Sequence, residues 1–128
     1  MRKQYSLRRA ADGAFDAWDV DRLVKLAADL PVRQIEVESI AELDEEYWFT
    51  DSDEPATVRK VVEHVQLIAE VDFDHPIVLD VDGRVMDGMH RVARALAEGR
   101  DTVPAVRFAV QPDPDYRNCV PSDLPYDE

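Results

Sequence analysis

Apolar residues recur every three or four positions in three stretches of the chain, and this spacing predicts amphipathic helices. The predicted helices run from about 19 to 30, from 57 to 70 and from 89 to 98. The second has the clearest apolar stripe, formed by Val58, Val61, Val62, Val65, Ile68 and Ala69. The third is expected to bury one face, formed by Met89, Val92, Ala93 and Leu96. Residues typical of helix ends stand at the boundaries, namely Asp19 or Asp21, Pro31, Thr57 and Gly99.

Shorter patterns between the helices predict strands. Residues 34–37 alternate polar and apolar side chains, and residues 76–80 form an apolar run typical of a buried strand. Asp82-Gly83 is a strong hairpin signal, because both residue types tolerate the backbone of tight turns. It predicts a return strand over residues 84–86, and a last strand is expected within residues 103–110.

Helices and short strands in this order predict a compact α/β domain of the α+β type, in which helices surround a small mixed sheet. We expect this domain to occupy residues 32–110, after an N-terminal helical extension over residues 1–31 and before a Pro-rich acidic tail over residues 111–128. Residues 1–18 carry no clear pattern and are expected to be poorly packed, with Phe15 and Trp18 as candidate anchors. A chain of 128 residues has the usual size of one domain.

The charge of the chain bears on its partners. With 28 acidic and 15 basic residues, the formal net charge is −13. A field of this sign repels phosphate backbones, so DNA and RNA are disfavoured partners. Residues 84–107 depart from this pattern, because arginines outnumber acidic residues there. This segment suits a small anionic ligand better than a long nucleic acid.

The cellular setting follows from what the sequence lacks. No apolar run approaches the roughly 20 residues that cross a bilayer, and the basic N-terminal residues are not followed by the apolar stretch of a signal peptide. Cys119 is the single cysteine, which excludes an internal disulfide and a metal site built from several cysteines. These features predict a cytoplasmic protein without membrane contact.

The strongest candidate for chemistry is Asp87-Gly88-Met89-His90-Arg91, where a predicted strand turns into the third predicted helix. Gly88 permits a sharp turn and a close approach of a ligand to the backbone. The first amides of a helix have no partners within it and, together with the helix dipole, they attract anions. Arg91 offers a fork that fits a phosphate, and His90 can donate a hydrogen bond or move a proton.

The negative charge of Asp87 would repel a bound anion, so its presence at an anion site implies a further role. It would then hold Mg²⁺, orient a hydroxyl group or act as a base. The same five residues are also compatible with an ordinary turn in which Arg91 pairs with a surface carboxylate. The spacing of these residues alone does not distinguish an anion site from an ordinary turn.

Residues 76–95, followed by Thr102-Val103-Pro104-Ala105-Val106, resemble the ParB/sulfiredoxin superfamily. Members have a strand containing Pro-Ile, a hairpin, a Gly-X-His-Arg or Gly-X-Arg-Arg turn into a helix, and a short strand ending in a Val-Pro-type segment. Residues 34–40 resemble the first strand of that fold. The resemblance covers roughly residues 32–110 and is most specific at residues 87–91.

Two branches of the superfamily differ from this chain at the turn. Sulfiredoxins have a reactive cysteine immediately before the His-Arg pair, and Met89 in that position argues against sulfiredoxin activity. Partition-type ParB proteins have a Gly-Glu-Arg-Arg turn that binds CTP, and they continue into a helix-turn-helix domain. Here the turn is followed by a short Pro-rich acidic segment, so we expect no centromere-binding role.

The free-serine kinase branch is the most similar in chemistry. Its members hold nucleotide phosphates with an Asp-Gly-X-His-Arg turn, and this chain matches that turn at Asp87, Gly88, His90 and Arg91. They also use an acidic residue after the first strand as a base on the serine hydroxyl. The candidates for that residue here are Glu42, Glu45 and Glu46, with Glu38 as a further one. Each of them is also compatible with a solvated surface carboxylate.

Two main functions follow from the turn and the resemblance. In the first, the protein is a phosphotransferase or nucleotide hydrolase that uses ATP, ADP or CTP with Mg²⁺. The nucleotide would be held by residues 88–91 and the metal by Asp87, and the catalytic groups would be Asp87, His90 and one of the three glutamates at 42, 45 and 46. In the second, a non-catalytic module binds a nucleotide or another small anion and signals to a protein partner. A carboxylate that faces the phosphates from across the pocket would favour the first function, and a pocket with only hydrogen-bond donors would favour the second. Nucleic-acid binding is a third hypothesis, which the net charge of −13 disfavours.

Other residues have chemical potential but simpler explanations. Tyr47-Trp48-Phe49 can stack on a nucleobase, although such a cluster more often fills the edge of a core. His64 is expected to be a hydrogen-bonded or partly exposed helix residue, and His75 lies at the start of a strand near the turn. The acidic residues within 51–54 suggest a solvated loop rather than a metal site.

Overall fold

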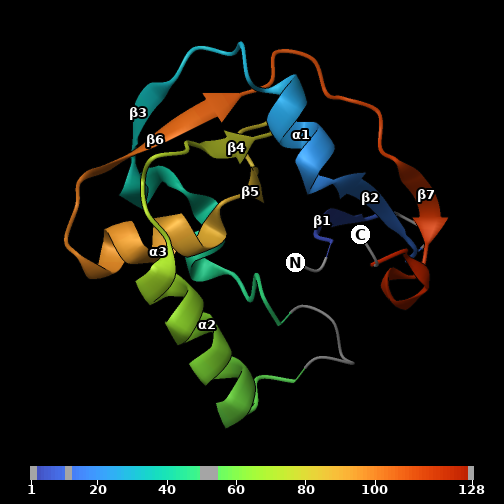
Figure 1. Ribbon diagram of the computed structural model, residues 1–128, viewed down its shortest axis with the longest axis horizontal. Helices are drawn as coiled ribbons and strands as arrows, with labels where there is room; N and C mark the ends of the chain where they lie inside the picture. Colours follow the sequence, from blue (N-terminus) through green and yellow to red (C-terminus); the bar gives the residue numbers. More distant parts are fainter. Residues whose placement is uncertain (1–2, 11–12, 50–54, 127–128) are drawn as a thin grey trace.

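Two small sheets and three helices make up the structure, a computed structural model that describes residues 3–10, 13–49 and 55–126 (Figure 1). The strands are β1 (Tyr5–Arg9), β2 (Phe15–Asp19), β3 (Arg33–Glu36), β4 (Ile77–Leu79), β5 (Val85–Asp87), β6 (Thr102–Arg107) and β7 (Tyr116–Cys119). The α-helices are α1 (Val20–Leu26), α2 (Val58–Glu70) and α3 (Met89–Ala97), and the short 3₁₀ helices are η1 (Val37–Ser39), η2 (Ala41–Asp44) and η3 (Pro121–Asp123). This mixed content confirms the predicted α+β class.

The four-stranded sheet positions the candidate turn. Its strands lie in the order β3-β6-β4-β5, with β4 parallel to β6 and the other neighbours antiparallel. Side chains of β4 alternate between two cores, because Ile77 and Leu79 belong to the cluster that contains residues of α3, and Val78 to the cluster that contains residues of α1. Both faces of the sheet are therefore covered, which explains the continuous apolar run in β4. The predicted hairpin at Asp82-Gly83 joins β4 to β5.

The three-stranded sheet joins the beginning of the chain to its end. In it β2 pairs with both β1 and β7, in each case antiparallel (Figure 1). The sequence did not predict β1 and β2 within the N-terminal extension, where Ala17 and Trp18 are buried, nor the strand Tyr116–Cys119 within the Pro-rich tail. The apolar alternation in these segments is short and interrupted by charges, and their pairing is long-range, so periodicity does not reveal it.

Two of the helices depart from their predicted limits or faces. Asp19 caps α1 through a hydrogen bond from the Asp21 amide, as predicted, but the helix ends at Leu26, well before Pro31. In α3 the buried residues are Met89, Val92 and Ala95, whereas Leu96 is 46% exposed. Residues 96–98 are all exposed, so the last turn of α3 does not lie over the core.

Helix α2 has no buried residue, in contrast to α1 and α3. Its predicted cap is confirmed, because the Thr57 hydroxyl accepts a hydrogen bond from the Lys60 amide at 3.2 Å. The helix packs on α3 and reaches away from both sheets (Figure 1). Its predicted apolar stripe consequently remains largely exposed.

Candidate functional site

The turn between β5 and α3 requires a glycine. Gly88 is the N-cap residue of α3 and has a φ of 101°, which L-residues with a side chain rarely adopt. A Cβ atom at this position would lie 2.8 Å from the Cγ2 atom of Ile77. Backbone conformation and the lack of space both exclude other residues, so the first amides of α3 are held directly after the end of β5.

Asp87 and Arg91 lie beside each other at this turn. Arg91 Nη1 and Asp87 Oδ2 are 3.7 Å apart, and the two side chains are about equally shielded, at 20% and 21% exposure. Burial raises the pKa of the Asp87 carboxyl, while Arg91 and the Gly88 amide partly offset this effect. The Nε atom of Arg91 is buried and has no hydrogen-bond partner in the structure. A buried donor without an acceptor costs about 1–3 kcal/mol, so an acceptor supplied by a ligand would be favourable here.

His90 points toward α2 rather than toward Asp87. Its Nε2 atom lies 2.8 Å from Nδ1 of His64, and both imidazoles stack on Trp48 with centroid distances of 4.6 and 4.3 Å. The two imidazole centroids are only 5.1 Å apart, so both rings cover the same face of the indole. Rings on opposite faces would be separated by about the sum of the two stacking distances. The opposite face of Trp48 is not covered by either imidazole.

Burial, His64 and Arg91 together lower the pKa of His90 to about 4. His90 is therefore neutral at physiological pH, with one ring nitrogen as a donor and the other as an acceptor. A neutral imidazole next to Arg91 adds no positive charge to the turn. It can still donate a hydrogen bond, provided that His64 does not engage the same nitrogen.

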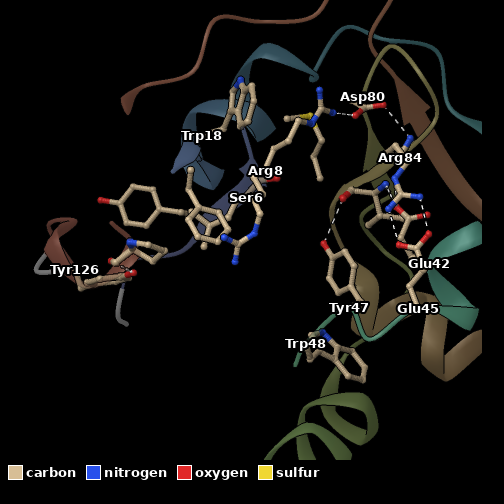
Figure 2. Close-up of a pocket in the computed structure, with 17 residues that line it drawn as sticks. Ser6, Arg8, Trp18, Glu42, Glu45, Tyr47, Trp48, Asp80, Arg84 and Tyr126 are labelled. Atoms are coloured by element: carbon tan, nitrogen blue, oxygen red, sulfur yellow. Dashed lines mark hydrogen bonds and ion pairs between the residues drawn. The ribbon is translucent and has the colours of Figure 1, made fainter. Parts of the chain in front are cut away.

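A cleft of about 540 Å³ lies between the three-stranded sheet and the β4–β5 hairpin (Figure 2). This volume is in the range of small-molecule sites. All five residues of β1 line it, and its aromatic residues are Tyr5, Phe15, Trp18, Tyr47, Trp48 and Tyr126. Three arginines, Arg8, Arg9 and Arg84, line its walls together with the carboxylates of Glu42, Glu45 and Asp80, so neither charge is in excess there. The candidate turn does not line this cleft directly.

Asp80 connects the two sides of the cleft. It is fully buried, and its Oδ1 atom accepts hydrogen bonds from the amides of Asp82 and Arg84, both at 2.9 Å. Its other carboxylate oxygen forms an ion pair with Arg8 of β1. Figure 2 shows this pair reaching across the cleft. Asp80 therefore stabilises the hairpin turn and also holds the N-terminal strand against it.

Two of the glutamates proposed as bases are engaged by Arg84. Glu45 forms a bidentate pair with it at 2.6 and 2.8 Å, which lowers the pKa of Glu45. Glu42 is 2% exposed, accepts a hydrogen bond from the Val85 amide and lies 3.8 Å from Arg84. The third candidate, Glu46, is exposed and does not line the cleft. The carboxylate closest to the turn is thus Asp87 rather than one of these glutamates.

Tyr47 and Trp48 link the cleft to the turn. The Tyr47 hydroxyl donates a hydrogen bond to the Val85 carbonyl at 3.2 Å, and burial, Glu42 and Asp87 raise its pKa to about 12. Trp48 lines the cleft and stacks on His90. Both side chains are partly buried against the main core, as expected for an aromatic cluster at a core edge.

Several features of this region could not be found from the sequence. Arg8 lies in a segment without a clear pattern, and the pairing of His64 with His90 depends on how α2 packs on α3. Asp80 offered a signal, because an aspartate two residues before Asp82 can cap the hairpin turn. His75 is exposed, and Cys119 lies in β7 with Sγ 3.2 Å from the Phe15 carbonyl. The predicted acidic loop at 51–54 lies outside the described residues.

Residues 3–10, 13–49 and 55–126 also determine what can be said of metal sites and membrane-spanning helices. There, no three His, Cys, Asp or Glu side chains come together as a metal site, so Asp87 stands as a single carboxylate for the expected Mg²⁺. No described helix is both long and apolar enough to cross a membrane. Comparisons with known proteins find no matching family model, no similar curated protein and no similar solved structure.

Proposed function

We propose that this protein binds a nucleotide or another small phosphate-bearing anion at the Gly88 turn, defined as residues 87–91. The proposal combines the resemblance to the ParB/sulfiredoxin superfamily with the local chemistry. One observation carries it: the buried Nε of Arg91 has no hydrogen-bond partner among the described residues. A phosphate oxygen is the kind of acceptor that an arginine fork and the first amides of a helix bind together.

The role of Asp87 follows from its distance to Arg91. At 3.7 Å the two charges attract each other but do not form a tight bidentate pair. A phosphate that takes Arg91 as its partner would leave Asp87 close to the anion. Because burial already raises the pKa of Asp87, a bound anion would raise it further and favour uptake of a proton. Ligand binding should therefore be coupled to protonation at this carboxyl.

Trp48 supports a nucleotide over inorganic phosphate. It stacks on His90 of the Gly88 turn and also lines the aromatic cleft. A nucleobase could stack on the indole face that the two imidazoles leave uncovered, with a free energy of about 1–3 kcal/mol. The net charge of the chain is −13, which repels the long phosphate backbone of a nucleic acid. This favours a compact ligand over DNA or RNA.

A binding module is favoured over a phosphotransferase by the engagement of the glutamates. Glu42 and Glu45 already interact with Arg84, and both would have to leave it to act as a base. Catalysis would then depend on Asp87, whose raised pKa suits proton transfer. Mg²⁺ commonly uses one or two carboxylates together with the phosphates of its nucleotide, and Asp87 could serve in this way. We also propose a cytoplasmic location, where a chain with one cysteine needs no disulfide.

Thermal denaturation tests the binding proposal. The melting temperature of the full chain is measured with ATP, ADP, CTP, GTP and inorganic pyrophosphate, each with and without Mg²⁺. We expect at least one ligand to raise it by several degrees, because a ligand that binds only the folded state stabilises it. The rise should disappear in Arg91→Ala and persist in Arg33→Ala, which removes an exposed arginine of β3 far from the turn in the sequence. No rise with any of these ligands, or an equal rise in Arg91→Ala, would contradict the proposal.

The catalytic alternative needs its own assay. Wild type, Asp87→Asn and Glu45→Gln are incubated with each nucleotide that binds, with and without serine, and free phosphate and phosphoserine are measured. Turnover that Asp87→Asn abolishes and Glu45→Gln preserves would favour an enzyme with Asp87 as its base. Binding without turnover in any condition would favour the module.

A further inference from the structure

Helix α2 presents an apolar face that nothing within the described chain covers. Four residues at successive spacings of four, three and four, Val58, Val62, Val65 and Ala69, lie within about 60° of one another at 100° per residue. The three valines are 82%, 48% and 56% exposed. Such a contiguous apolar stripe on an otherwise well-defined helix typically marks an interaction surface. The helix packs mainly on α3, and Trp48 and Phe49 contact its His64.

The contacts of α2 with α3 fix which side is free. His64 of α2 pairs with His90 of α3, and Arg94 of α3 donates hydrogen bonds to the carbonyls of Ala69 and Val71 at the end of α2. At 100° per residue, His64 lies about 100° from Val65 and about 160° from Val62. The stripe therefore points away from the side that meets α3. Figure 1 shows α2 extending from the body of the molecule, so a partner can approach along its length.

The charges beside the stripe identify the partner. Arg59 near the N-terminal end and Glu70 at the C-terminal end lie on the same flank of the stripe, about 20° apart in projection. Equivalent flanks face each other when two helices pack antiparallel. Two copies of α2 in that orientation would place each Arg59 beside the Glu70 of the other copy. Glu63, on the same flank near the middle, already has Lys60 as a partner at 3.8 Å.

The centre of the stripe and the centre of these charges lie one residue apart. Val58 and Ala69 at the two ends are symmetric about a point between residues 63 and 64, and Arg59 and Glu70 are symmetric about a point between 64 and 65. One two-fold axis near the middle of α2 therefore satisfies both. The small side chains of valine and alanine also permit a close approach of the two helices.

We propose that the protein forms a symmetric dimer in which the α2 helices of two copies pack antiparallel through Val58, Val62, Val65 and Ala69. The 13-residue helix is about 20 Å long, which is short for the roughly 800 Å² per partner of a standard interface. The dimer is consequently weak and concentration-dependent. Each copy keeps its own Gly88 turn outside this interface. The dimer proposal therefore does not depend on the proposed ligand.

Sedimentation velocity of the full chain over a range of concentrations tests the dimer. The wild type is expected to shift from monomer to dimer as the concentration rises, and Val62→Glu should raise the dissociation constant at least tenfold. Leu67→Glu is the matched control, because Leu67 of the same helix is similarly exposed, at 44% against 48% for Val62, but lies about 140° away around the helix. Circular dichroism checks that both variants keep the wild-type fold. A monomeric wild type at every concentration, or an equal effect of both substitutions, would overturn the proposal.

A charge exchange tests the antiparallel orientation. Arg59→Glu should weaken the dimer by placing two glutamates side by side, and the double variant Arg59→Glu with Glu70→Arg should restore it. A double variant as weak as the single one would overturn the antiparallel arrangement. In a parallel pair each Arg59 would face the opposite flank of its partner rather than Glu70, so an Arg59→Glu variant that leaves the dimer unchanged would also overturn the antiparallel arrangement.

Discussion

The Nδ1 atom of His64 and the Nε2 atom of His90 lie 2.8 Å apart, and both imidazoles cover one face of Trp48. This arrangement joins α2, the aromatic residues 47–49 and the first turn of α3. It removes His90 from the group of charged residues at the Gly88 turn, because burial and the neighbouring His64 and Arg91 keep it neutral. The histidine of the motif therefore acts in this structure mainly as a packing and hydrogen-bonding residue.

Acid should weaken the fold through His90. Its pKa is about 4 in the folded protein, below the usual value, so the neutral form stabilises the fold above about pH 6.5 and this contribution is lost as the pH falls toward 4. After solvent screening we expect a loss of about 1–2 kcal/mol. Denaturant unfolding at pH 7 and pH 4 should show a smaller decrease for His90→Gln than for the wild type. Equal decreases would contradict this account.

Asp87 affects the pH dependence of stability in the opposite direction. Its raised pKa means that the contribution of its neutral form is present below the usual carboxyl range and is lost as the pH rises through the folded-state pKa. Both effects fall in the acidic range and have opposite signs, so NMR titration of the two side chains is needed to separate them. The His90 ring protons should titrate near pH 4.

Gly88→Ala should be much more damaging than Gly99→Ala. Both glycines have a positive φ, but an alanine Cβ at position 88 would lie 2.8 Å from Ile77, whereas nothing lies within 4 Å at position 99. We expect a loss of about 3 kcal/mol for Gly88→Ala, from backbone strain and overpacking together, and about 1 kcal/mol for Gly99→Ala. Chemical denaturation measures both. Similar losses would show that the turn is not sterically fixed.

Arg8→Ala should destabilise the protein by leaving the fully buried Asp80 without its cation. Because Arg8 is 43% exposed, solvent moderates the loss to about 2 kcal/mol. Adding Asp80→Asn should recover part of it, since an amide oxygen can still accept from the two backbone amides of the turn. Arg9→Ala is the control, because the Arg9 guanidinium stacks on Phe15 instead of pairing with a buried carboxylate. If Arg8→Ala and Arg9→Ala have the same effect on unfolding, Asp80 does not hold the N-terminal strand.

Glu42→Ala should lower the stability of the fold, in contrast to Glu46→Ala. Glu42 is 2% exposed and accepts the Val85 amide hydrogen bond, so its removal leaves a buried donor without an acceptor. We expect a loss of about 2–3 kcal/mol for Glu42→Ala and less than about 0.5 kcal/mol for the exposed Glu46. A Glu42→Ala variant with unchanged stability would reopen a catalytic role for this carboxylate.

The elements around the turn were predictable because their signals are local. The apolar run of β4, the Asp82-Gly83 hairpin and the periodicity of α3 each follow from residues close in sequence. The three-stranded sheet was not, because Phe15–Asp19 pairs with a strand near the other end of the chain. Nothing in a local window records such a partner, and the charged residues between the apolar ones conceal the alternation.

In the candidate site, too, the features set by neighbouring residues were predictable and those set by tertiary packing were not. The sequence placed Asp87, Gly88 and Arg91 together correctly, since they adjoin one turn. It could not determine that Glu42 would be buried under the hairpin or that Arg84 would engage Glu45, because those contacts depend on how η2 packs against β5. The cleft could not be predicted either, because its walls combine β1 with side chains from η2, the β4–β5 hairpin and the C-terminal segment.

The most direct test of the phosphate site observes the Arg91 side chain itself. In a ¹⁵N-labelled full chain, the Nε–H signals of arginines are recorded during titration with ATP and with pyrophosphate, and Arg91→Lys assigns the signal of interest. The account predicts that the Arg91 Nε–H signal shifts downfield and becomes protected from exchange with water, together with shifts of the first amides of α3. Titration that leaves the Arg91 signal unchanged while other arginines respond would contradict the claim that the Gly88 turn binds phosphate.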